Sequence, residues 1–270
     1  MSTAVRKAAV AGRFYPNNES ALRRDLAAYA PQKAQPAAAI GCIAPHAGYM
    51  YSGHVAGAVY AQIAIPRRVV VLCPNHTGLG HPLAIMARTC WQTPLGEVPA
   101  DPAMATALME RFPLLREDSE AHRAEHAIEV QLPFLQNRRE DVSLVPIAVG
   151  TREYDILRAL GIALAAVISE QSEPVLIVAS SDMNHYESDA ITRVKDNHAV
   201  ERVLALDARG LWEVVQREEI SMCGFGPSVV MLTSATRLGA KQAALVKYAT
   251  SGEISGDYDS VVGYAGIAVS

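Results

Sequence analysis

The sequence of 270 residues lacks the features that mark several common classes of protein. It contains no uncharged apolar run of about 18 residues or more, so we expect no membrane span. Its four cysteines form no C-x-x-C pair, which in a chain of this size suggests reduced thiols in a cytoplasm and not a disulfide framework. The N-terminus has no long apolar core and no clear cleavage site, so we expect no signal peptide and a cytoplasmic location.

Signals for nucleic acids and nucleotides are also absent. The formal net charge is −4, whereas a general nucleic-acid binder normally has a basic surface. There is no P-loop, no G-x-G-x-x-G after a strand, no G-x-S-x-G elbow and no kinase signature. We therefore expect no nucleic-acid partner and no nucleotide cofactor.

The pattern that is present is typical of an α/β protein. Half of the residues are hydrophobic and 19% are charged, an ordinary soluble composition. Short apolar runs alternate with helical stretches, which predicts a largely parallel sheet covered by helices on both faces. The strands are expected at 40–44, 69–73, 142–149, 174–179, 243–250 and 261–269. No repeat or long linker interrupts the pattern, so we predict a single domain over residues 1–270.

Two helix starts have clear caps. Asn18 or Ser20 is positioned to cap a helix over 21–29. Asp101 is positioned to cap a helix over 102–111, with Pro102 at its first residue.

Glycine and proline set the other expected boundaries. The segment 47–53 is rich in glycine, so the next helix is expected to begin near His54. A helix is expected over 125–136, with Pro133 ending or kinking it. The Pro/Ala segment 31–39 is expected to be a linker.

Three of the expected strand ends are followed by a histidine. His46 follows the run 40–44, His76 follows 69–73, and His185 follows 174–179. Each histidine alone could equally be a hydrogen-bonded structural residue. However, ligands in open α/β sheets bind beyond the carboxyl ends of the strands, and imidazole is the commonest protein metal ligand. Their equivalent positions therefore indicate one shared site.

Cys223 is a further candidate ligand. It lies in the Gly/Phe/Gly break before Pro227, where the N-terminus of a following helix would favour a thiolate. The alternative is a buried, inert thiol. Two imidazoles and a carboxylate would suggest non-haem iron, whereas a thiolate favours copper or zinc, with iron still possible.

His122, Glu125 and His126 match the pattern H-x-x-E-H of inverted zinc proteases. The pattern is short, and His122 lies in a charged stretch, 116–123, that is typical of a solvated loop. A role for His126 in handling protons, with Glu125 orienting it, is therefore favoured over a zinc site.

Seven motifs along nearly the whole chain resemble one known family, the Memo (mediator of cell motility) proteins and their prokaryotic relatives. These motifs are Ala11–Pro16, Ala44–Tyr49 with Tyr51–Gly53, Pro74–Gly78, Glu125–Phe134, Ser180–His185, Cys223–Gly224, and Ser255–Asp257 with Val261–Tyr264. The resemblance implies an α/β/α sandwich similar to the LigB-type class III extradiol dioxygenases, which hold Fe(II) with two histidines and a glutamate.

The resemblance also implies roles for individual residues. His46 and His76 resemble the two metal histidines, and Cys223 stands where the dioxygenases have their carboxylate. His185 resembles the acid/base histidine and His126 a second histidine of the pocket. Asp182 belongs to the motif of His185 and would orient or supplement the metal ligands. Because Cys223 departs from the dioxygenase pattern, ring cleavage does not follow from the resemblance.

These observations together predict a protein that binds one copper or iron ion, with zinc possible, in a dioxygenase-like pocket. Redox chemistry or O₂-dependent oxidation of an unknown substrate is its expected use. The first alternative is a non-catalytic module that binds a peptide or small ligand in the same cleft, and a less favoured one is a zinc hydrolase. The resemblance further implies protein partners of the radical-SAM-associated group.

Overall fold

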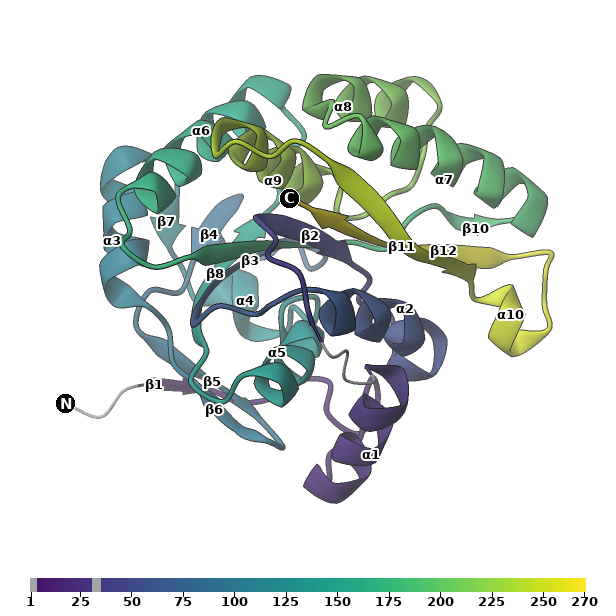
Figure 1. The fold of residues 1–270 in the computed structure, drawn as a ribbon, viewed down its shortest axis with the longest axis horizontal. Helices are drawn as coiled ribbons and strands as arrows, with labels where there is room; N and C mark the ends of the chain where they lie inside the picture. The colour runs from purple at the N-terminus through teal and green to yellow at the C-terminus, as the bar shows by residue number, and fades with distance from the viewer. Residues whose placement is uncertain (1–3, 31–34) are drawn as a thin grey trace.

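The computed structural model describes residues 4–30 and 35–270 (Figure 1). Nine strands form its central sheet. They are β2 (Gly41–Ala44), β3 (Arg68–Pro74), β4 (Leu83–Ile85), β7 (Arg116–Glu117), β8 (Ser143–Val149), β9 (Val175–Ser180), β10 (His185–Glu187), β11 (Ala243–Thr250) and β12 (Val261–Val269). Their order is β10-β12-β2-β9-β3-β8-β4-β7, with β11 paired to β12.

The middle of the sheet is parallel. The neighbouring strands β2, β9, β3 and β8 all run in the same direction, while β12 and β4 lie antiparallel on either side of them. Every residue of β2, β8 and β9 is buried, as continuous apolar runs predict for strands covered on both faces. The predicted α/β architecture around a largely parallel sheet is confirmed.

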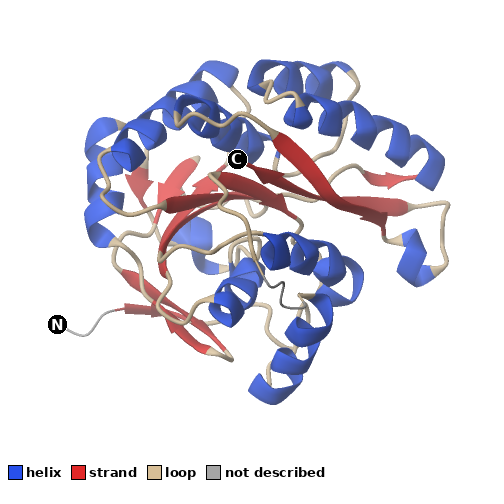
Figure 2. Cartoon of the chain, viewed as in Figure 1, coloured by secondary structure: helices blue, strands red, loops and turns tan. Residues whose placement is uncertain are grey.

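Helices cover both faces of this sheet (Figures 1 and 2). One face packs against α3 (Pro102–Arg111), α6 (Tyr154–Ser169), α7 (Asp189–Leu204), α8 (Ala208–Arg217) and α9 (Phe225–Arg237). The other packs against α1 (Glu19–Tyr29), α2 (Tyr49–Gln62), α5 (Leu132–Arg138) and a small sheet of β1 (Ala4–Arg6), β5 (Thr89–Thr93) and β6 (Gly96–Val98). The short helices are α4 (Glu120–Arg123), η1 (Glu129–Gln131) and α10 (Gly252–Ser255).

Most expected boundaries agree with the structure. Asn18 caps α1 by accepting a hydrogen bond from the backbone of Ala21, and Asp101 caps α3 in the same way through Met104. The two C-terminal strands have the predicted limits. Residues 31–34 of the expected linker lie outside the described residues.

The expected start of α2 was wrong. The helix begins at Tyr49, inside the glycine-rich segment 47–53 that was expected to precede it, and it also includes Gly57. A Cβ atom at Gly57 would lie 2.3 Å from the carbonyl oxygen of Tyr29 in α1. This glycine therefore allows α1 and α2 to pack closely and does not break the helix.

The expected helix over 125–136 was also wrong. Glu125 and His126 lie in a non-helical segment, followed by the single turn η1 and then α5. Pro133 lies in the first turn of α5, where its missing N–H costs nothing, and does not end the helix.

Within residues 4–30 and 35–270, no helix is long and apolar enough to cross a membrane.

Candidate metal centre

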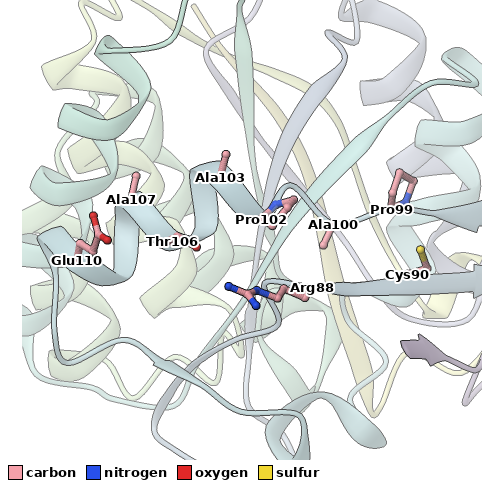
Figure 3. Close-up of a pocket in the computed structure, with 9 residues that line it drawn as sticks. All are labelled: Arg88, Cys90, Pro99, Ala100, Pro102, Ala103, Thr106, Ala107 and Glu110. Atoms are coloured by element: carbon pink, nitrogen blue, oxygen red, sulfur yellow. The ribbon is translucent and has the colours of Figure 1, made fainter. Parts of the chain in front are cut away.

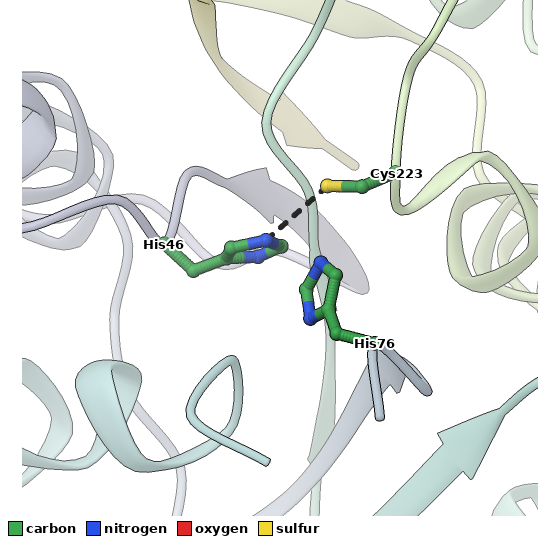
Figure 4. Close-up of side chains that lie close together, drawn as sticks. All are labelled: His46, His76 and Cys223. Carbon is green, nitrogen blue, oxygen red and sulfur yellow. Dashed lines mark hydrogen bonds between the residues drawn. The ribbon is translucent and has the colours of Figure 1, made fainter. Parts of the chain in front are cut away.

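Strand order explains why distant histidines meet. Strand β9 pairs with β2 on one side and with β3 on the other, so the ends of all three strands lie at one edge of the sheet. His46 follows β2 and His76 follows β3. Their ring centroids are 5.1 Å apart (Figure 4).

Cys223 joins the two histidines from the loop before α9. A Cβ atom at Gly224 would lie 2.4 Å from the carbonyl oxygen of Ser180, so glycine is required for this loop to contact the end of β9. The Cys223 sulfur lies 3.2 Å from Nε2 of His46 (Figure 4). The structure thus brings together the three ligands expected from the sequence.

The donor atoms of this group fit a transition-metal ion. One atom from each of His46, His76 and Cys223 lies within 4.8 Å of the other two. Donors bound to a tetrahedral ion at ~2.0–2.3 Å lie about 3.3–3.8 Å apart, so small side-chain adjustments would suffice. Nδ1 of His46 lies 3.0 Å from the Ser180 hydroxyl and Nδ1 of His76 lies 2.9 Å from the Glu125 carboxylate. Both Nε2 atoms are therefore the ones left for a metal.

The charges around Cys223 also favour a cation. Burial, and then the negative charge of Asp182, raise the pKa of the Cys223 thiol well above its usual value. These two effects outweigh the backbone hydrogen bonds of Asp182 and Gly224, which lower the pKa and favour the thiolate. Burial also lowers the pKa of His46, so its imidazole is neutral, the form that binds a metal. A bound cation would supply the positive charge that a thiolate needs here.

A second group of possible donors consists of His76, Glu125 and His126. The Glu125 carboxylate already accepts hydrogen bonds from the backbone N–H groups of His76 (2.7 Å) and Ala127 (3.0 Å), as well as from Nδ1 of His76. A carboxylate behind a histidine typically orients that histidine toward a metal. Glu125 therefore fits an orienting role better than that of a ligand.

His126 lies beside this pair. Its ring stacks on His76, with centroids 4.9 Å apart, and its Nδ1 lies 3.5 Å from the Glu125 carboxylate. On another side it contacts the ring of Phe14, 4.7 Å between centroids. Phe14 precedes α1 and was not expected in the site, because no spacing in the sequence links it to the histidines.

Asp182 and His185 occupy different positions after β9. The Asp182 carboxylate accepts hydrogen bonds from the backbone N–H groups of His46 (2.7 Å) and Ala47 (3.3 Å), so it orients the segment that carries His46. Burial raises the pKa of Asp182 to about 6. The half-buried His185 is held by its backbone N–H, which donates to the Ser221 hydroxyl at 2.7 Å, and its ring contacts Tyr186. The acid/base roles of His185, His126 and Asp182 remain predictions.

The H-x-x-E-H pattern does not form a zinc site. Helix α4 ends at Arg123, so His122 and His126 do not share a helical face. The expectation that His122 lies in a solvated loop was wrong, because its side chain is fully buried. Its ring centroid lies 5.7 Å from that of Trp91, and its Nε2 lies 3.3 Å from the carbonyl oxygen of Ala84. Neither donor group among the described residues includes His122.

A large pocket of about 710 Å³ lies elsewhere, between β5 and α3 (Figure 3). Its lining includes Cys90, Arg88 and Glu110 but none of the histidines of the site. The candidate metal centre is therefore identified by the geometry of its donor atoms and not by cavity volume.

The fold and the site define an α/β protein with a histidine–cysteine donor group at the carboxyl edge of its sheet. The family model described as "Memo-like protein" matches residues 6–268, and the chain belongs to the Memo family, as its motifs predicted. A MEMO1 family protein of Methanopyrus kandleri is 41% identical over 280 residues, covering 97% of this chain and 98% of the relative. One from Methanosarcina mazei is 40% identical over 270 residues, covering 98% and 99%.

Among solved structures, the chain is similar to the crystal structure of an uncharacterized protein from Escherichia coli K12. The TM-score is 0.57 at 15% identity, and the match covers 84% of this chain and 98% of the other. At this identity the likeness shows the fold alone.

Proposed function

We propose that this Memo family protein binds one copper or iron ion through His46, His76 and Cys223 and uses it for redox chemistry on a ligand in the cleft. One observation carries the proposal: two Nε2 atoms and one sulfur converge while both Nδ1 atoms are engaged by Ser180 and Glu125. A thiolate with two imidazoles suits copper, and also iron or zinc.

A copper or iron ion held by these donors would supply electron transfer and O₂-dependent oxidation. The side chains around it have separate tasks. Glu125 orients His76, and Asp182 holds the backbone of His46. His126 and His185 would give protons to, or take protons from, a small-molecule or peptide ligand. The His76 side chain is 32% exposed, which leaves an approach for such a ligand.

Metal analysis of protein purified without added metal tests the ligand set. We expect about one ion per chain in the wild type and loss of that ion in His46→Ala, His76→Ala and Cys223→Ala. The matched controls His81→Ala and Cys90→Ala lie outside both donor groups and should keep it. Stoichiometric metal in His46→Ala and Cys223→Ala would show that the ligand set is wrong.

Wild-type protein that binds no copper, iron or zinc at micromolar concentration would favour the non-catalytic binding module. A catechol-cleavage assay with Fe(II) under reducing conditions tests whether the protein acts as a ring-cleaving dioxygenase. In that assay, activity that survives His185→Ala would contradict the acid/base role of His185.

A further inference from the structure

A chain of buried polar groups lies behind His46. Nδ1 of His46 lies 3.0 Å from Oγ of Ser180, which lies 2.6 Å from the carbonyl oxygen of Ala127 and 2.8 Å from Nε2 of Gln131. The Gln131 amide oxygen in turn lies 3.0 Å from the Tyr60 hydroxyl. His46 is 2% exposed and the other three side chains are fully buried, so water does not compete for these bonds.

The partners of Gln131 decide which way its amide points. Its Nε2 lies within 3.0 Å of the carbonyl oxygen of Pro45 and 3.3 Å of that of Ala44, and a carbonyl only accepts. The amide nitrogen therefore donates one N–H to Ser180 and shares the other between the two carbonyls, while the amide oxygen accepts from Tyr60.

Ser180 has one proton to donate. The carbonyl oxygen of Ala127, its closest polar neighbour, can only accept, so the hydroxyl proton is directed there. The Ser180 oxygen is then an acceptor for Gln131 and for His46 alike. Nδ1 of His46 must therefore carry the proton of the neutral imidazole, and Nε2 presents its lone pair to Cys223.

We infer that Ser180 and Gln131 are positioning residues that hold His46 in the Nδ1–H tautomer and so keep its Nε2 ready to bind a cation. The role of the cation rests on the proposed function, whereas the tautomer does not. A neutral hydroxyl performs for His46 the task that the Glu125 carboxylate performs for His76.

Imidazole ¹⁵N NMR of the metal-free protein at mildly alkaline pH tests the inference, with His46→Ala used to assign the signals. We expect the His46 spectrum to show a protonated Nδ1 and an unprotonated Nε2. In Ser180→Ala, which removes the acceptor, this tautomer should no longer dominate. The control Ser234→Ala also loses a fully buried hydroxyl that donates only to carbonyls, and it should leave the His46 signals unchanged.

A Cu(I) or Zn²⁺ titration of the same variants provides the second readout. Loss of a group that orients a ligand typically weakens metal binding by about 10–100-fold, and we expect this for Ser180→Ala but not for Ser234→Ala. A wild-type His46 with its proton on Nε2 would overturn the inference even if Ser180→Ala failed to fold. Unchanged tautomer and affinity in a folded Ser180→Ala would also overturn it. A wild type that binds no metal would refute the proposed function, yet the NMR result would still decide the tautomer.

Discussion

Replacing Glu129 by glutamine tests a buried ion pair that fixes the N-terminal segment to the rest of the chain. The fully buried carboxylate accepts four hydrogen bonds. Their donors are Arg6 Nη1 (2.7 Å), the Tyr15 hydroxyl (2.8 Å) and the backbone N–H groups of Ala9 (2.8 Å) and Val10 (3.0 Å). Glutamine is neutral and offers one oxygen in place of two, so it cannot serve all four donors.

The expected loss is large because the charge of Arg6 would remain buried without its partner. The side chains of Arg6 and Glu129 are only 5% and 0% exposed, so solvent screens them little. Removing one member of a buried pair costs about 3–5 kcal/mol. The surface pair of Arg23 and Glu19, whose side chains are 53% and 58% exposed, provides the contrast. Glu19→Gln should cost about 0.5 kcal/mol or less.

Urea unfolding followed by tryptophan fluorescence measures both variants. Trp91 is fully buried, and the Arg6 guanidinium lies 4.1 Å from the centroid of its ring, so the part of the signal that comes from Trp91 reports on this cluster. A loss below about 1 kcal/mol in Glu129→Gln would refute the reasoning. We also expect this variant to disturb the candidate metal centre, because Arg6 donates to the carbonyl oxygen of Glu125 at 2.7 Å.

Three further changes have clear expected outcomes. Burial raises the pKa of Asp196 from 3.8 to about 7. Between about pH 4 and 7 the folded chain therefore binds one more proton than the unfolded chain, so the free energy of unfolding falls as the pH rises through this window. Asp196→Asn should therefore gain stability over the wild type at about pH 8 but little at about pH 4 in thermal unfolding, and an equal change at both would contradict this. Gly57→Ala should lose about 1–3 kcal/mol in urea unfolding, because the new Cβ would meet the Tyr29 carbonyl at 2.3 Å, and an unchanged midpoint would argue against that clash. A metal at about 100 times its Kd should stabilise the wild type by about 2.7 kcal/mol, and the same gain in Cys223→Ala would exclude that ligand.

Much of the fold could be predicted from the sequence, because continuous apolar runs give buried parallel strands directly. The errors came where tertiary packing reverses a local rule. The glycine-rich segment 47–53 suggested a late helix start, yet Gly53 lies inside α2 at its contact with α1, as Gly57 does. The charged stretch around His122 suggested a solvated loop, yet this histidine packs against Trp91. Neither contact has a signal in the local sequence.

The candidate ligands could be found because His46 and His76 each follow the end of a strand and Cys223 precedes the start of a helix. Asp182 and Glu125 were also expected as orienting groups, but other groups that support the ligands could not be found. Gln131 reaches the Ser180 hydroxyl from η1, and Phe14 reaches His126 from the N-terminal segment. These partners depend on how loops cross the sheet edge, which residue spacing alone does not encode.

A hydroxyl adjoins Nδ1 of His46 and a carboxylate adjoins Nδ1 of His76, and this difference is consistent with the negative charge already present at the site. The Glu125 carboxylate adjoins His76, while the Asp182 carboxylate lies against the backbone of His46, and metal binding would add the thiolate of Cys223. A second carboxylate behind His46, in place of Ser180, would bury one more negative charge beside Asp182. Burial raises the pKa of Asp182 to about 6 although the backbone N–H groups of His46 and Ala47 lower it, so negative charge is already disfavoured on this side of the site. A neutral hydroxyl fixes the His46 tautomer without that cost, so a thiolate in the ligand set and serine behind His46 are mutually consistent.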